Sequence, residues 1–196
     1  GLITLLEDTS DQSSPGERGA VNPLDLEPTA GGHEFPGVTA WLNGDPIASL
    51  DELEGKVVLI DFWTYTCVNC IRTIPFLRAW NDKYGDKGLV IIGIHSPEFT
   101  FEKSLDNVRT AVEDLGIPWL VANDPERTTW DAFRARAWPT KILFGFDGRE
   151  RKRVVGEGQY EEMEQIIQLS LVESGVEVPD TTFATENPDL EIYDSL

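Results

Sequence analysis

Cysteine is scarce in this chain, whose 196 residues include only two cysteines, one methionine and two histidines. Two thiols are too few for a structural disulfide framework, and a four-thiolate zinc site needs twice as many. Basic residues are also few, because 16 Lys and Arg stand against 35 Asp and Glu and leave a formal net charge of −19. This charge argues against nucleic acid or an anionic membrane surface as a partner, since both would repel the chain.

The acidic charge has three possible meanings: a preference for basic partners, adaptation to high salt, or solubility without a specific partner. We favour solubility alone. No Lys or Arg follows Arg153, and no internal repeat is visible. The apolar stretch from Leu2 to Leu6 is too short to cross a bilayer.

The two cysteines lie close together, as Cys67 and Cys70, where a predicted strand gives way to a predicted helix. The residues from Val57 to Trp63 are apolar and rich in β-branched side chains apart from Asp61, a pattern typical of a strand buried on both faces of a sheet. From Val68 to Tyr84, apolar residues recur at helical spacing. We therefore expect Cys67 at, or just before, the first turn of a helix.

That position favours chemistry between the two thiols. Unpaired backbone N–H groups and the positive end of the helix dipole stabilise a thiolate at a helix start. A lowered pKa makes Cys67 a nucleophile near neutral pH, and Cys70, one turn further in, is placed to attack a mixed disulfide and release the partner. The alternative is a pair of idle reduced thiols in a core.

The surrounding residues resemble the thioredoxin superfamily over roughly residues 35–174. The matching motifs are Asp61-Phe62-Trp63, the C-x-x-C pair, Pro75 five residues after Cys70, and Trp138-Pro139-Thr140. The resemblance implies a thioredoxin-like α/β fold with a mixed central sheet and helices on both faces. It also implies a redox-active Cys67–Cys70 disulfide with no other cofactor and no metal, a buried acid at Asp61 and a cis proline at Pro139. It further places Trp63 beside the disulfide.

One feature departs from thioredoxin itself. The dipeptide between the cysteines is Val68-Asn69, where thioredoxin has Gly-Pro. The redox potential depends on this dipeptide and its surroundings, so it is not carried over.

A closer resemblance is to the extracytoplasmic TlpA/ResA-like branch, and within it to the DipZ-like thiol-disulfide oxidoreductases. The segments Thr64 to Pro75 and Gly93 to Phe99 carry it. Members of this branch begin with a short β-hairpin ahead of the core, and residues 38–50 have that form, with Asn43-Gly44 as a two-residue turn signal. Thr73 stands where ResA-type proteins have a functional glutamate, so Asp61 is the expected buried acid.

The rest of the pattern predicts alternating strands and helices that complete a mixed α/β sheet. Further strands are predicted at residues 89–94, 118–122, 141–146 and 151–155. Further helices are predicted at residues 101–115, 125–134 and 160–173, with Asp124 as the N-cap of the second and Gly175 after the last.

We predict three parts: a flexible N-terminal linker at residues 1–32, a thioredoxin-like domain at 33–174 and an acidic, loosely ordered C-terminal tail at 175–196. Ile192 and Tyr193 in the tail are candidates for docking. Because the chain begins with Gly1 and not Met, the resemblance implies a signal peptide or membrane anchor upstream and an extracytoplasmic location. A cytoplasmic location is the alternative.

Asp61 and Pro139 each have a functional and a plainer interpretation. Burial should raise the pKa of Asp61 and let it exchange a proton with the Cys70 thiol, whereas a structural carboxyl would only bond to the backbone. A cis Pro139 would place the adjacent backbone against Cys67, where it could pair with an extended substrate peptide. A trans proline would simply end a helix.

Four more side chains are weaker candidates. Trp138 and Tyr65 form an apolar rim for substrate around the cysteines, or merely pack. His95 and Glu98 lie just past a strand end, on the side where ligand sites gather in α/β proteins, or serve only to shape a loop.

The leading prediction is a thiol-disulfide oxidoreductase in which Cys67 attacks a protein disulfide and Cys70 resolves the mixed disulfide. The resemblance implies a membrane electron donor of the DsbD/CcdA kind, and we expect a monomer. One alternative is a peroxiredoxin-like thiol peroxidase, since Thr64-x-x-Cys67 is part of that pattern and Arg136 supplies a positive charge. Against it, Ile60 stands where that pattern has proline.

A second alternative is a copper-binding chaperone that resembles the Sco-like proteins. Cys67, Cys70 and His95 would be its ligands. The cysteines of Sco-like proteins are spaced one residue wider, which makes this the weakest of the three hypotheses.

Overall fold

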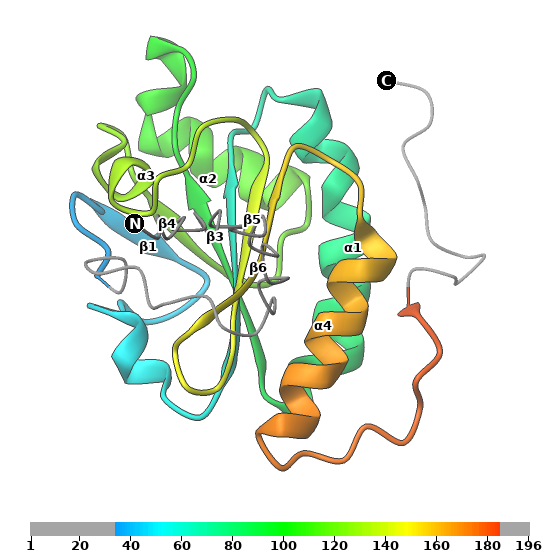
Figure 1. Ribbon diagram of the computed structural model, residues 1–196. Helices are drawn as coiled ribbons and strands as arrows, with labels where there is room; N and C mark the ends of the chain where they lie inside the picture. Colours follow the sequence, from blue (N-terminus) through cyan, green and yellow to red (C-terminus); the bar gives the residue numbers. More distant parts are fainter. Residues whose placement is uncertain (1–33, 185–196) are drawn as a thin grey trace, which may run out of the picture.

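A computed structural model describes residues 34–184, which form one six-stranded mixed sheet with helices packed on it (Figure 1). The strand order is β1-β4-β3-β2-β5-β6. The strands are β1 (Ala40–Leu42), β2 (Val57–Trp63), β3 (Leu89–His95), β4 (Leu120–Asn123), β5 (Thr140–Phe144) and β6 (Glu150–Val155). The helices are α1 (Val68–Tyr84), α2 (Leu105–Asp114), α3 (Thr128–Ala132) and α4 (Tyr160–Glu173), with short 3-10 turns η2 (Leu50–Leu53), η3 (Gly85–Lys87) and η4 (Thr100–Lys103).

Strand β2 lies inside the sheet and is buried along its whole length. It runs parallel to β3 and antiparallel to β5, and β3 is parallel to β4. The outer strands β1 and β6 are both antiparallel to their neighbours. A strand covered on both faces has a nearly continuous apolar sequence, and this pattern predicted β2. The predicted mixed α/β sheet is confirmed.

Alternate residues of β2 enter two separate cores. Leu59 and Trp63 point to the face covered by α1, α2 and α4, and Ile60 and Phe62 point to the face covered by α3 and the segment that precedes β1. Figure 1 shows α1 and α4 side by side over one face of the sheet. Asp61 belongs to the same alternating set as Leu59 and Trp63, so its carboxyl points toward α1.

Helix α1 begins and ends where the sequence predicts. Cys67 is its N-cap, and the side chains that face the sheet include Ile74, Leu77 and Trp80, all buried. The spacing of these residues places them on one face of a helix. The buried face of α1 therefore fixes the start of the helix, and with it Cys67, against the end of β2.

The predicted N-terminal hairpin is wrong. Strand β1 pairs with β4 and not with residues 46–50, of which only Ser49 makes an isolated bridge, to Glu34. Asn43 does turn the chain, with φ of 65°, but its side-chain amide donates hydrogen bonds to the carbonyl oxygens of Ile117 and Trp119, at 2.7 and 3.0 Å. These contacts attach the turn to the segment before β4, and β1 extends the edge of the main sheet.

Two predicted helices are shorter than expected. The helix predicted at 101–115 is divided into η4 and α2, because Ser104 caps α2 by accepting a hydrogen bond from the Asn107 N–H. The helix predicted at 125–134 is reduced to α3. Asp124 is not its N-cap residue, yet its carboxylate accepts hydrogen bonds from the backbone N–H groups of Thr129 and Trp130.

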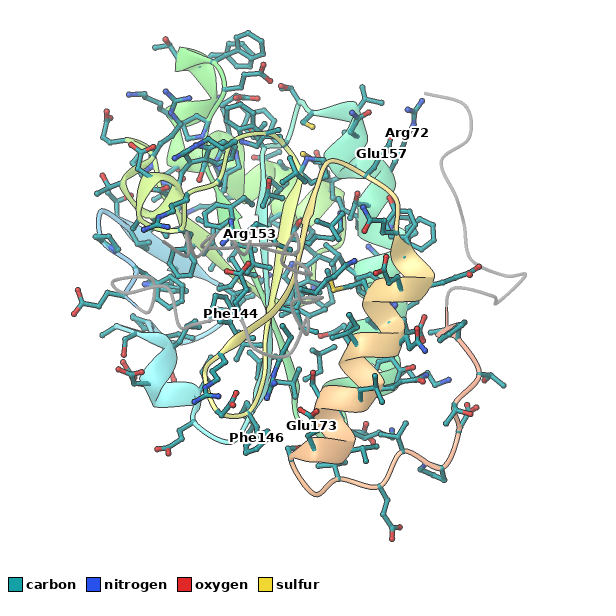
Figure 2. All side chains as sticks on the ribbon, in the orientation of Figure 1. Arg72, Phe144, Phe146, Arg153, Glu157 and Glu173 are labelled. Atoms are coloured by element: carbon teal, nitrogen blue, oxygen red, sulfur yellow. The ribbon has the colours of Figure 1, made fainter. Side chains whose placement is uncertain are left out.

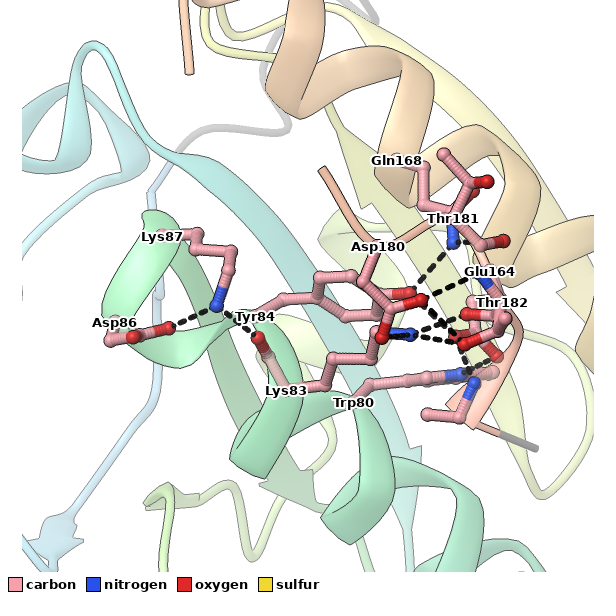
Figure 3. Close-up of polar contacts among 11 residues, drawn as sticks. Trp80, Lys83, Tyr84, Asp86, Lys87, Glu164, Gln168, Asp180, Thr181 and Thr182 are labelled. Carbon is pink, nitrogen blue, oxygen red and sulfur yellow. Dashed lines mark hydrogen bonds and ion pairs between the residues drawn. The ribbon is translucent and has the colours of Figure 1, made fainter. Parts of the chain in front are cut away.

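Residues 176–184 run beside α1 and α4 (Figure 3). The buried carboxylate of Glu164 accepts hydrogen bonds from Trp80 Nε1, Tyr84 Oη and the Ala184 N–H. Lys83 of α1 binds Thr182 and lies 3.1 Å from Asp180. The predicted boundary at residue 174 remains a prediction, and the predicted linker at 1–32 and the residues Ile192 and Tyr193 lie outside the described residues.

Within residues 34–184, no helix combines the length and the apolar composition needed to cross a membrane.

Candidate active site

The two cysteines lie where β2 passes into α1, and both thiols are free in this structure. A turn joins the two elements and is closed by the Cys67 N–H, which donates to the Thr64 carbonyl oxygen at 3.2 Å. Cys67 is partly exposed, whereas Cys70 is 1% exposed. The Cys67 Sγ accepts a hydrogen bond from the Cys70 backbone N–H at 3.2 Å. The helix start thus presents one accessible sulfur and holds a second, buried sulfur behind it.

The two thiols differ strongly in acidity. The pKa of Cys67 lies below its usual range because it accepts a hydrogen bond from the Cys70 thiol, and the backbone N–H groups of Cys70 and Asn69 act in the same direction against its partial burial. The pKa of Cys70 is raised, first by burial, then by the hydrogen bond to Cys67, the negative charge there and the carboxyl of Asp61. Cys67 is therefore the thiol that ionises more readily, and Cys70 keeps its proton.

Asp61 lies behind the cysteines in β2 and is 3% exposed. Burial raises its pKa to about 6, and the positive charge of Lys141 acts in the opposite direction. The predicted acid is thus buried near Cys70 and titrates close to neutral pH. Its position supports the predicted proton exchange, although the role itself remains a prediction.

A surface groove runs beside Cys67. Its walls come from the start of α1, from the loop after β3 and from the loop before β5; the lining residues are Thr66, Cys67, Val68, Asn69, Glu98, Arg136, Ala137 and Trp138. The Trp138–Pro139 peptide bond is cis, as the sequence predicts. Trp138 is held by a 2.7 Å hydrogen bond from its Nε1 to the Ser96 carbonyl oxygen, and its ring stacks on Trp130 at 4.2 Å.

The predicted residues His95, Tyr65 and Trp63 form a cluster at the ends of β2 and β3, and none of them lines this groove. The Tyr65 ring stacks on the His95 imidazole at 5.5 Å, and Trp63 meets the same imidazole edge-on at 5.3 Å. His95 is fully buried, and burial lowers its pKa to about 4, so the ring is neutral at pH 7. His95 was predicted just past the strand end but is the last residue of β3, whereas Glu98 lies in the loop that follows and lines the groove beside Cys67.

Two buried charged residues were not predicted as part of the site. Glu102 is fully buried, and its carboxylate binds the Thr66 hydroxyl and the backbone N–H groups of Glu98 and Phe99. Lys141 is fully buried and stands directly opposite Asp61 in the β2–β5 ladder. The sequence held one signal for Lys141, since it interrupts an apolar strand directly after the cis-proline motif.

Two observations concern the alternative functions, a thiol peroxidase and a copper-binding chaperone. Arg136 lines the groove with Cys67, but Thr64 is fully buried and shares a 3.3 Å hydrogen bond with His95 Nε2, so its hydroxyl is not directed at the groove. In the described part of the chain, no group of three or more His, Cys, Asp or Glu side chains is arranged to hold a metal ion.

Comparisons with known proteins agree with the geometry. The Redoxin family model matches residues 31–167. Protein DipZ of Mycobacterium bovis is 40% identical over 169 residues, which are 84% of this chain and 24% of DipZ. The thiol-disulfide oxidoreductase ResA of Bacillus anthracis is 29% identical over 68% of this chain and 74% of ResA.

Solved structures give the same fold. The solution structure of a thioredoxin-like protein in its oxidised form superposes with a TM-score of 0.65 at 26% identity, covering 76% of this chain and 97% of that protein. The predicted thioredoxin-like fold and the resemblance to DipZ and ResA are therefore confirmed, although the chain spans only about a quarter of the length of DipZ. This chain belongs to the Redoxin family.

Proposed function

We propose that this domain is a thiol-disulfide oxidoreductase that exchanges disulfides with protein partners through Cys67 and Cys70. One observation carries the proposal: the more acidic, accessible thiol stands at the N-cap of α1, with the less acidic thiol buried one turn behind it. This is the arrangement that a nucleophile and a resolving thiol require. The similarity to DipZ and ResA supports the same chemistry.

In the reducing direction, the Cys67 thiolate attacks one sulfur of a partner disulfide. The partner's second sulfur leaves as a thiolate and takes up a proton, and a mixed disulfide joins Cys67 to the partner. Cys70 then loses its proton to Asp61, and its sulfur attacks the Cys67 sulfur. The partner leaves as a dithiol, Cys67 and Cys70 are oxidised to a disulfide, and two electrons have passed to the partner. The oxidising direction reverses each step.

The groove beside Cys67 offers a place for the partner chain. An extended segment would lie along Trp138 and would pair with the backbone next to Pro139. Tyr65 does not line this groove, because its hydroxyl donates to the Phe101 carbonyl oxygen. Glu98 and Arg136 put one charge of each sign on this surface, so recognition depends on backbone and apolar contacts more than on net charge.

From the resemblance to the DipZ-like proteins we infer an extracytoplasmic location and a membrane electron donor of the DsbD/CcdA kind. We also infer that the protein is a monomer. The redox-active disulfide is the only redox group that the proposed reaction needs.

Reduction of insulin disulfides by dithiothreitol, with and without the protein, tests the proposal. Cys67→Ser should abolish the acceleration. Pre-reduced Cys70→Ser, mixed with insulin in the absence of dithiothreitol, should accumulate a mixed disulfide through Cys67, detectable by mass, because the resolving thiol is missing. The double variant Cys67→Ser/Cys70→Ser is the matched control and should trap nothing. Insulin reduction that persists in Cys67→Ser would refute the proposal, and rapid peroxide turnover that survives in Cys70→Ser would favour a peroxidase.

A further inference from the structure

Lys141 is an unusual residue for its place in the fold. It lies in β5, two residues after Pro139, and its side chain is fully buried. Lysine is almost never fully buried unless it is paired, because moving its charge out of water is costly. The β2–β5 register places Lys141 directly opposite Asp61, which is also buried. Directly opposed residues on antiparallel strands project to the same face, here the face toward α1.

Several elements contribute groups around the Lys141 ammonium. Its Nζ donates a 3.0 Å hydrogen bond to the Gly156 carbonyl oxygen and lies 5.6 Å from the centre of the Tyr160 ring. The titratable groups that face it are Asp61 from β2, Cys70 from α1, Tyr160 from α4 and Glu157 from the loop between β6 and α4.

Asp61 is the buried carboxyl among these groups. Glu157 is exposed and lies 3.8 Å from Arg72 of α1, so its charge is already engaged at the surface, where Figure 2 shows the two side chains together. Asp61 Oδ1 is buried and accepts no hydrogen bond from any described residue. Lys141 and Asp61 form no hydrogen bond or close ion pair, so Lys141 acts on this buried carboxyl through its charge, from the opposite position in the β2–β5 ladder.

We propose that Lys141 is a positioning residue whose ammonium holds the Asp61 carboxyl in its charged form, so that Asp61 takes the Cys70 proton in the resolving step. The inference rests on the proposed function. The proton moves from Cys70 Sγ to an Asp61 oxygen, the new Cys67–Cys70 bond forms as the Cys67–partner bond breaks, and the released partner thiolate is protonated from Asp61 or from water. Lys141 itself keeps its proton throughout and acts only through its charge.

Electrostatics gives the direction of the effect. Burial favours the neutral form of Asp61, and Lys141 opposes that preference. Without the ammonium, the pKa of Asp61 would rise above about 6, and the carboxyl would carry a proton at neutral pH. A protonated Asp61 has no capacity to accept the Cys70 proton, so resolution would begin only at higher pH.

The resolving step can be followed with an aromatic disulfide that releases a coloured thiolate. Attack by Cys67 releases the first equivalent, and attack by Cys70 releases the second. In Lys141→Met, we expect the pH midpoint of the second phase to move upward by roughly one pH unit or more, and its rate at pH 7 to fall roughly ten-fold. Lys152→Met removes a lysine of the neighbouring strand that pairs with Glu162 near the surface, and should leave both phases unchanged.

Two further variants separate charge from structure. Lys141→Gln retains a donor for the Gly156 carbonyl oxygen but lacks the charge, so it should behave like Lys141→Met if the role is electrostatic. In an Asp61→Asn background, Lys141→Met should no longer shift the midpoint, because its target is gone. A normal midpoint in folded Lys141→Gln, or an equal shift in both backgrounds, would overturn the inference. Absence of the second phase in the wild-type protein would instead refute the proposed function.

Discussion

The hydroxyl of Thr66 donates a hydrogen bond to the carboxylate of Glu102, which ties the residue before Cys67 to η4. The second carboxylate oxygen accepts hydrogen bonds from the backbone N–H groups of Glu98 and Phe99, at 2.6 and 2.8 Å. One fully buried side chain therefore joins two walls of the groove beside the nucleophile. The hydrogen bonds that Glu102 accepts outweigh the effect of burial and lower its pKa, which keeps the carboxylate charged.

We expect Glu102→Gln to destabilise the protein by about 1–3 kcal/mol, because an amide group replaces one of two oxygens that face only donors. Insulin reduction should slow as well, since the loop that carries Glu98 is no longer fixed to Thr66. Urea unfolding measures the first effect. Glu126→Gln is the matched control: this glutamate pairs with Lys103 at the surface, so its loss should change stability by less than about 1 kcal/mol. Equal losses in both variants would contradict the assigned role of Glu102.

The Cys67 thiol should ionise below the value of about 8.5 for a free cysteine. Its position at the N-cap of α1 and the hydrogen bond from the Cys70 N–H favour the thiolate. Titration of the ultraviolet absorbance of the thiolate in Cys70→Ala isolates Cys67. Because this variant removes the Cys70 thiol but keeps the backbone donors, its Cys67 pKa should lie between that of the wild-type protein and that of a free cysteine. A value at or above the free one would remove Cys67 as the nucleophile.

The carboxyl of Asp61 should make the protein less stable as the pH rises. Its pKa in the folded state is about 6, above the value of 3.8 for an exposed aspartate, so the folded state holds the proton more tightly. The penalty is absent below pH 3.8, grows up to pH 6 and is complete above it, at about 3 kcal/mol. Asp61→Asn should therefore gain stability relative to the wild-type protein between pH 5 and pH 8.

Urea unfolding of the reduced proteins at the two pH values measures this gain, which we expect to be about 1 kcal/mol or more over that range. The exposed Asp114 of α2 supplies a matched control as Asp114→Asn. A constant difference between Asp61→Asn and the wild-type protein would show that Asp61 has an ordinary pKa.

Elements with strong local patterns were predicted with their observed bounds. Strand β2, helix α1 and helix α4 begin and end at the predicted residues. Each combines a clear hydrophobic period with a sharp boundary, so sequence neighbours alone decide its conformation. The hairpin at residues 38–50 was not such a case. Asn43 turns the chain as its type suggests, but the partner of β1 is β4. The paired residues Ala40 and Asn123 lie 83 positions apart in the sequence, so local spacing does not predict their pairing.

Buried charges mark the limit of sequence-based prediction of the site. Cys67, Cys70 and Asp61 were predicted because they form a compact motif around one strand-to-helix junction. Glu102 and Lys141 were not, because a charged residue in sequence is normally a surface residue. Their burial depends on groups that the fold brings to them: Glu102 binds Thr66, and Lys141 binds the Gly156 carbonyl oxygen and lies opposite Asp61.

By itself, the sequence determined the chemistry of the site: two thiols at a helix start, an acid in the preceding strand and a proline ahead of β5. These features are local, since hydrophobic period, capping and spacing act over a few residues. Only the tertiary structure decided the electrostatics. The acidity of each group depends on its burial and on charges from distant strands and loops, and Lys141 lies opposite Asp61 only because β5 pairs with β2 in this register.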